Sequence, residues 1–233
     1  MMDDWSRVAE QVMLSAVENK IRSLAITSAK SGAGVSTLAH GLATAFARSG
    51  RKTLLVDMTV PVRVDGRIGG WTAGEPLPAD AIKLKNDGVS VLEVVASAAN
   101  RSMFSNVELL QKSFQRDLAS YACIVIDLPA VDDSETDRLN PIAAARAADA
   151  VLLVGLTGIT ERGELAEATQ KLRQVGANLT GIVMNDQYCA TLGEEIADES
   201  YTRLGRYFPR AAHWIAQKAL ATNYFGRNFR IVR

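Results

Sequence analysis

Uninterrupted apolar runs, each followed by a helical segment or loop, restrict this chain to very few folds. The runs occupy residues 22–29, 52–57, 89–95, 121–127, 150–156 and 179–185. They lack the apolar–polar alternation of a strand with one solvent-exposed face. Such continuous apolar runs are typical of parallel strands that are buried on both faces. Helical patterns follow several of them, at 36–50, 102–119, 139–148 and 161–175. We therefore expect a doubly wound, mostly parallel α/β sheet with helices on both faces and ligands at the strands' carboxyl ends.

The remaining segments are less regular. An amphipathic helix is expected over residues 5–20, and 58–88 should be mostly loop, because it is rich in Pro and Gly, with a short helix near 78–85. We divide the 233 residues into a P-loop NTPase-like domain, 1–200, and a basic, aromatic C-terminal helix and tail, 201–233. Trp71, in the Pro- and Gly-rich insertion, is interpreted as a local anchor rather than a partner contact.

Composition excludes several classes of protein. The net charge is zero, so no nucleic-acid partner is favoured. The first residues lack a basic start and an apolar core, so we expect no secretory signal, and no apolar run reaches the roughly 20 residues that span a bilayer. Two cysteines, Cys123 and Cys189, show no metal-binding or disulfide pattern. These features predict a cytoplasmic protein.

The segment "AKSGAGVST" (29–37) has the composition of a phosphate-binding loop. Glycines after an apolar strand let backbone N–H groups surround phosphates, and the following helix N-terminus favours negative charge. The predicted nucleotide-binding residues of this loop are Lys30, Ser31, Gly32, Ala33, Gly34, Val35, Ser36 and Thr37. Val35 stands where a P-loop carries its lysine.

Two carboxylates close neighbouring apolar runs. Asp57 ends 52–57 and Asp127 ends 121–127. A single Asp at a strand end is more often a turn or cap residue. With the loop, however, Ser36, Asp57 and Asp127 form a predicted Mg²⁺ site, because hydroxyl and carboxylate oxygens are the ligands that Mg²⁺ prefers.

The order of these segments resembles the MinD/ParA class of deviant P-loop ATPases. The phrases "IVIDLPAV" and "GANLTGIVMN" are most similar to the bacterial tyrosine kinases (BY-kinases) that work with polysaccharide co-polymerases. The resemblance implies that Asn185 reads the adenine edge and that Lys30 is the signature lysine, which reaches phosphates across a dimer. It also implies catalytic roles for Asp57 and Lys30, and ATP or ADP with Mg²⁺ as cofactor.

The chain departs from the BY-kinase pattern at several positions. Val35 replaces the P-loop lysine, Thr59 replaces the second carboxylate after Asp57, and Pro61 replaces an arginine. The N-terminal segment reads Glu10-x-x-Met13-x-x-Ala16 instead of Glu-x-x-Arg-x-x-Arg, and the end of the chain has no tyrosine cluster. We therefore expect weak or lost nucleotide binding and little or no kinase activity, since phosphoryl transfer depends on charge stabilisation.

The resemblance also implies a cellular setting, with alternatives. The first hypothesis is a role in exopolysaccharide or capsule biosynthesis and export, as a homodimer held at the inner face of the membrane by a Wzz-like co-polymerase. The second is a positioning ATPase of the MinD/ParA type, of the pilus or cell-pole localisation class and without kinase function, because some pilus-positioning members also lack the P-loop lysine and keep the signature lysine. The third is a true ATPase in which another residue replaces the P-loop lysine. The basic, aromatic C-terminal segment suits a membrane surface, a docking partner, a nucleic acid or a helix packed on the sheet.

Overall fold

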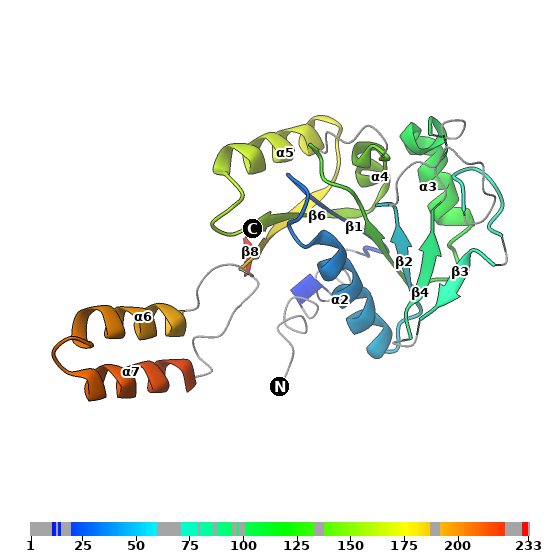
Figure 1. Cartoon of the computed structure of the whole chain (residues 1–233). Helices are drawn as coiled ribbons and strands as arrows, with labels where there is room; N and C mark the ends of the chain where they lie inside the picture. Colours follow the sequence, from blue (N-terminus) through cyan, green and yellow to red (C-terminus); the bar gives the residue numbers. More distant parts are fainter. Residues whose placement is uncertain are drawn as a thin grey trace.

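An eight-stranded sheet with helices on both faces forms the body of the protein (Figure 1). The computed structural model describes residues 11–12, 14, 20–59, 71–78, 80–85, 88–94, 97, 101–132, 138–186, 192–221 and 230–232. The strands are β1 (Ser23–Ser28), β2 (Thr53–Asp57), β3 (Ile82–Leu84), β4 (Ser90–Glu93), β5 (Cys123–Asp127), β6 (Ala150–Leu156), β7 (Leu179–Asn185) and β8 (Arg230–Val232). The helices are α2 (Val35–Arg48), α3 (Val107–Arg116), α4 (Pro141–Ala147), α5 (Arg162–Gln174), α6 (Leu192–Leu204) and α7 (Pro209–Ala221), with a 3₁₀ turn η1 (Met103–Ser105).

The strand order is β3-β4-β2-β5-β1-β6-β7-β8. The strands from β4 to β7 in this order are parallel, whereas β3 and β8 pair antiparallel at the two edges. The central strands are almost fully buried, which explains their continuous apolar sequences. The predicted fold class is confirmed.

Two apolar cores lie on opposite faces of the sheet. On one face α2 buries Leu38, Leu42 and Phe46, which recur every four residues along one side of the helix. On the other face α3, α4 and α5 cover the sheet, and their buried residues include Phe114 and Leu172. Each such side chain contributes about 1.5–3 kcal/mol when fully buried, so the helices are fixed mainly by these contacts.

Helix starts follow capping signals in the sequence. The side chain of Asn106 accepts a hydrogen bond from the Leu109 N–H at 3.1 Å, at the start of α3. Asn140 accepts from the Ile142 N–H at 2.9 Å and is followed by Pro, which favours the first helical position of α4. Glu161 and Glu164 form a reciprocal capping box at the start of α5.

The prediction of a short helix near 78–85 is wrong. Ile82–Leu84 instead forms β3, which pairs antiparallel with β4. The Lys85 N–H donates to the Val89 carbonyl at 2.9 Å, and Gly88 adopts φ +84°, so a tight turn brings the two strands together. Pairing with β4 thus overrides the weak local preference of this segment.

Trp71 is an internal anchor, as the sequence indicated. Its side chain is fully buried, with ring centroids 6.2 Å from those of Phe104 and Phe114. Its backbone N–H donates to the Glu93 carbonyl at 3.1 Å, which extends the edge of the sheet beyond β4. The insertion is therefore fastened to the α3 side of the body.

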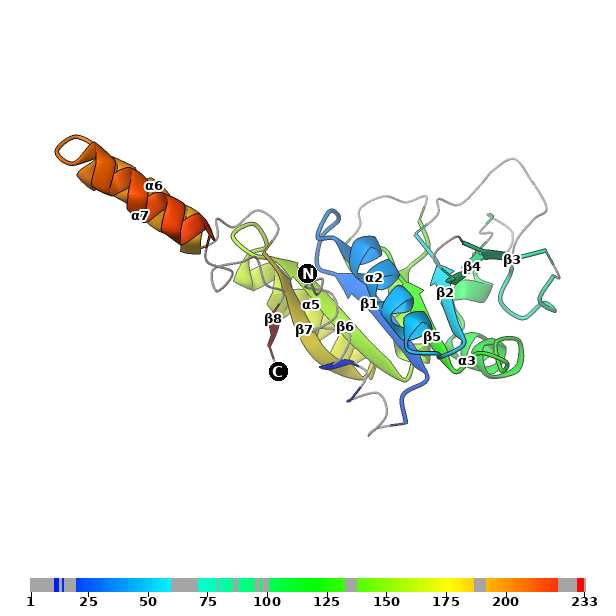
Figure 2. The ribbon, with the colours of Figure 1, turned by 90° about the horizontal axis from the view of Figure 1, so that it is seen from below.

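The C-terminal region contains a helical hairpin and a returning strand. Helices α6 and α7 pack against each other and project from the sheet body (Figures 1 and 2). Helix α6 spans residue 200, and β8 pairs antiparallel with β7. The division of the chain at residue 200 stays a prediction. Among the described residues, no helix combines the length and apolar character needed to cross a bilayer.

Several sequence expectations concern residues outside the described ranges. They include most of the helix expected over 5–20 with its Glu10-x-x-Met13-x-x-Ala16 pattern, and Pro61 and Cys189. Of the first helix, Val12 is buried in the core on the α2 side.

Candidate functional site

The loop after β1 begins the site. Gly32 and Gly34 have φ values of +85° and +89°, a region that glycine enters without steric cost. The Leu38 N–H donates to the Gly34 carbonyl at 3.0 Å, so Gly34 is the residue from which α2 starts. The first turn of α2 carries no acidic side chain, which leaves the positive end of the helix dipole for an anion.

Backbone hydrogen bonds hold the loop against the segment that follows β5. The Val131 N–H donates to the Ser28 carbonyl at 2.8 Å, and the Asp132 N–H donates to the Ala29 carbonyl at 3.2 Å. The Ser28 hydroxyl donates to the Lys30 carbonyl at 2.7 Å. The loop is therefore pre-organised, which lowers the conformational entropy that is lost when it binds a phosphate group.

Asn185, at the end of β7, supports the loop from inside. Its side-chain amide donates to the Ala33 carbonyl at 2.9 Å, and the residue is buried. A Cβ on Gly34 would lie only 2.5 Å from the Asn185 amide nitrogen, so any larger residue at this position would displace the Asn185 side chain. The adenine-reading role of Asn185 stays a prediction, and the structure gives this residue a supporting contact that the sequence did not indicate.

Asp57 and Asp127 are brought side by side. They are register partners at the carboxyl ends of β2 and β5, whose backbones lie about 4.8 Å apart. Asp127 is buried, and burial raises its pKa to about 7, while a hydrogen bond with Ser36 opposes the rise and the charge of Asp57 adds to it. The two carboxylates and the Ser36 hydroxyl thus lie at one edge of the sheet, as the sequence predicted.

The donor set suits Mg²⁺. The Oδ1 atom of Asp127 is buried and has no hydrogen-bond partner. A buried polar atom without a partner destabilises the folded state unless a bound ligand interacts with it. Mg²⁺ is usually held by one or two carboxylates, waters and substrate phosphates rather than by a full protein cage. The described part of the chain holds no group of three or more His, Cys, Asp or Glu side chains poised for a metal. Asp127, Ser36 and Asp57 are therefore the residues that would hold the ion.

Thr59 does more than replace a carboxylate. Its backbone N–H and its hydroxyl both donate to the Oδ1 atom of Asp57, at 2.9 and 2.7 Å. These bonds fix the orientation of the Asp57 carboxylate and occupy the lone pairs of its Oδ1 atom. The position that carries a second carboxylate in BY-kinases here supplies two hydrogen-bond donors.

Lys30 is held within its own chain. Its ammonium forms an ion pair with Glu164 in the first turn of α5, and the side chain of Lys30 is 64% exposed. The hydrogen bond with Glu164 raises the pKa of Lys30, and the same bond lowers the pKa of Glu164. Glu164 was not predicted as a site residue, because 134 residues separate it from Lys30 and only the fold brings them together.

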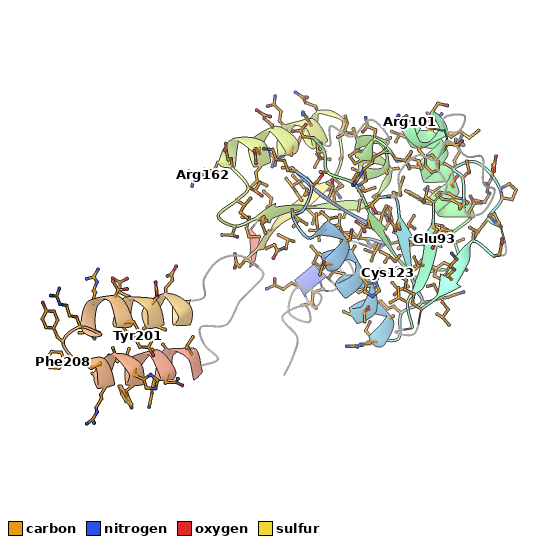
Figure 3. The ribbon with its side chains drawn as sticks, viewed as in Figure 1. Glu93, Arg101, Cys123, Arg162, Tyr201 and Phe208 are labelled. Atoms are coloured by element: carbon orange, nitrogen blue, oxygen red, sulfur yellow. The ribbon has the colours of Figure 1, made fainter. Side chains whose placement is uncertain are left out.

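Two further ionisable residues, Asp132 and Cys123, have structural roles. Asp132, in the acidic loop after β5, forms an ion pair with Lys171. Cys123 (Figure 3) is buried, and burial raises the pKa of its thiol to about 12, so it stays protonated and unreactive. The acidic residues at 133, 135 and 137 lie outside the described ranges.

The fold and this site define a P-loop-type nucleotide-binding domain. The family model of the CobQ/CobB/MinD/ParA nucleotide binding domain matches residues 24–199, and the chain belongs to this family. Within it, the chain is 29% identical over 203 residues to the tyrosine-protein kinase CpsD of Streptococcus agalactiae, which covers 82% of this chain and 85% of CpsD. It is 27% identical over 197 residues to the tyrosine-protein kinase YwqD of Bacillus subtilis, covering 78% of this chain and 80% of YwqD.

Solved structures show the same fold. The BceF tyrosine kinase domain superposes with a TM-score of 0.62 at 22% identity, covering 77% of this chain and 75% of that one. The MinD protein of Pyrococcus horikoshii, solved with Mg-ADP, gives a TM-score of 0.53 at 24% identity over 72% of each chain. These structural likenesses show the shared fold. The family model and the sequence relatives named tyrosine-protein kinase confirm the resemblance to the BY-kinase branch of the MinD/ParA class.

Proposed function

We propose that this protein is a BY-kinase-like P-loop protein that holds ATP or ADP with Mg²⁺ weakly and transfers phosphoryl groups little or not at all. The observation that carries the proposal is Val35, an aliphatic residue at the first position of α2, in a site that otherwise keeps its shape.

The retained parts favour binding. The backbone N–H groups of the loop, the acid-free start of α2, the Ser36 hydroxyl and the unpaired oxygen of Asp127 can together receive phosphates and their metal ion. Mg²⁺, when bound, would offset the negative charge of the phosphate oxygens. None of these interactions requires the missing lysine.

The side chains that the site lacks, a lysine at position 35 and a carboxylate at position 59, are those that accelerate phosphoryl transfer. A lysine at position 35 would stabilise charge that develops on the transferred phosphoryl group, and one such donor is worth about 10²–10³ in rate. Thr59 removes a candidate base and restrains Asp57 through two hydrogen bonds. Both changes act in the same reaction centre.

The cellular role follows the resemblance. We propose action in exopolysaccharide or capsule biosynthesis and export, as a homodimer at the inner face of the membrane, recruited by a Wzz-like co-polymerase. The kinship with proteins named tyrosine-protein kinase CpsD and CapB supports this setting.

Isothermal titration of the whole chain with Mg·ADP and Mg·ATP tests the nucleotide proposal. We expect weak binding that requires Mg²⁺ and is reduced in Ser36→Ala, with Thr37→Ala as a neighbouring-hydroxyl control. Absence of binding at millimolar nucleotide would leave only a scaffold and contradict the proposal.

A positioning ATPase of the MinD/ParA type is the second candidate, and Lys30 favours it. This lysine is kept although the P-loop lysine is lost, and its side chain is largely exposed. Deletion of the gene separates the two roles. Loss of surface polysaccharide supports the first, and misplaced polar structures or pili with normal polysaccharide support the second.

A further inference from the structure

The α6–α7 hairpin has its small residues inside and its large apolar residues outside. Over residues 195–220, where side-chain burial is described, the buried positions of the two helices carry small residues, namely Ala197, Ser200, Ala212, Ala216 and Ala219. By contrast, Tyr207, Phe208 and Trp214 are 73%, 64% and 63% exposed. The large side chains therefore contribute little to the packing of the hairpin, and an exposed aromatic group of this kind marks a contact surface.

Tyr207 and Phe208 lie at the outer end of the hairpin, between α6 and α7. Figure 3 places Phe208 at the end farthest from the sheet body, with Tyr201 nearby on α6. The hairpin projects clear of the body in both views (Figures 1 and 2), so a broad flat surface can reach this end without colliding with the sheet.

Charge is segregated along the hairpin. Acidic residues lie in the first part of α6, at Glu194, Glu195, Asp198 and Glu199, and no acidic residue follows in the sequence. The outer end carries Arg203, Arg206 and Arg210, all exposed, of which Arg203 pairs with Glu199. The outer end is thus basic as well as aromatic.

We propose that this basic, aromatic outer end binds an anionic lipid bilayer surface. Aromatic side chains with one polar edge, such as Tyr and Trp, settle at the level of lipid headgroups, and exposed arginines attract anionic lipids. A bilayer satisfies both features over one surface, because its headgroup layer offers apolar contact for the aromatic side chains as well as negative charge for the arginines. The proposal does not depend on the nucleotide site, and it adds a direct lipid contact to recruitment by a protein partner.

The test is co-sedimentation of the full chain with two kinds of vesicle, one of phosphatidylcholine alone and one that also contains about 30 mol% phosphatidylglycerol. The anionic phosphatidylglycerol gives the second kind a negative surface potential. We expect binding only to the anionic vesicles, weakened by salt. Neutralising Arg206 and Arg210 together by Arg→Gln should weaken binding roughly 25-fold, at about fivefold for each charge. Tyr207→Ser with Phe208→Ser should weaken it by about tenfold or more.

Matched controls lie on the sheet body. Leu84→Ser removes an equally exposed apolar side chain from β3, and Arg173→Gln removes an exposed arginine from α5, and both should bind vesicles as the parent does. Binding that is equal in parent and outer-end variants, or absent from anionic vesicles, would overturn the proposal. The proposal would also be overturned if the chain did not bind vesicles and the outer end were instead required for self-association or for oligonucleotide binding. Because the four side chains are exposed, the variants should fold, which circular dichroism verifies.

Discussion

The ammonium of Lys30 and the carboxylate of Glu164 form an ion pair that joins the phosphate-binding loop to the first turn of α5. In relatives of this class the equivalent lysine is expected to reach phosphates in a partner subunit. While Lys30 contacts Glu164, it is engaged within its own chain. Glu164 therefore competes with any nucleotide-dependent dimer that uses Lys30.

Glu164→Gln should release Lys30 and strengthen dimerisation in the presence of Mg·ATP, and Lys30→Ala should abolish it. Glutamine keeps the capping role at the start of α5, so the helix should survive. Sedimentation velocity with and without Mg·ATP measures the effect, and Glu167→Gln, an exposed carboxylate on the same helix, is the control. If both Lys30→Ala and Glu164→Gln associate as the parent does, Lys30 has no role across an interface.

Gly34→Ala should destabilise the protein more than Gly32→Ala. Both glycines have positive φ, so each alanine costs about 1–2 kcal/mol in backbone strain. Only at Gly34 does the new Cβ meet a side chain, the amide of Asn185, and the displaced hydrogen bond adds about 1 kcal/mol. Chemical denaturation gives both values. Adding Asn185→Ala to Gly34→Ala should cost less than the sum of the single losses, and strict additivity would contradict this contact.

Ionisation of Asp127 should destabilise the metal-free protein as pH rises. Its folded-state pKa of about 7 lies above its ordinary value of 3.8, so the folded chain binds this proton more tightly than the unfolded chain. The stability that the proton provides is fully present below about pH 4 and is lost as the pH rises to about 7. The loss lowers the free energy of unfolding by a few kcal/mol.

Asp127→Asn isolates this effect, since the neutral amide has nearly the same shape as the protonated carboxyl group. In EDTA, the free energy of unfolding of Asp127→Asn relative to the parent should increase between pH 5 and pH 8. A difference that stays constant over this range would show that Asp127 ionises normally in the folded chain.

Val35→Lys should tighten Mg·ATP binding, because it returns a positive charge to the start of α2. Val35→Met lengthens the side chain without charge and serves as the control. Titration calorimetry should show a gain for lysine of about tenfold or more and little change for methionine. Equal affinities in the two variants would mean that the phosphates do not approach this position.

The buried strands and the meeting of the carboxylates could be predicted from the sequence. The run "CIVID" is buried throughout β5, so its apolar continuity directly reflects its place in the sheet. Asp57 and Asp127 each close such a run, and parallel strands end at one edge, which made their proximity predictable.

Edge strands and contacts between distant segments could not be predicted in this way. In β3, Lys83 and Leu84 are exposed, so its sequence carries no burial pattern and its structure comes from pairing with β4. The Lys30–Glu164 pair and the Asn185 amide bond to the loop join residues more than 130 positions apart. Nothing local in the sequence specifies such contacts before the fold is known.

The most direct test of the central claim is phosphate release from Mg·ATP, measured alongside phosphorylation of a tyrosine-containing peptide. We expect the parent chain to turn over no faster than Asp57→Ala, and Val35→Lys to turn over faster than the parent by up to about 10²–10³-fold, the effect of one lysine-type donor. Robust turnover by the parent chain that Asp57→Ala abolishes would contradict the proposed function, because it would show that the site is catalytically complete without a lysine at position 35.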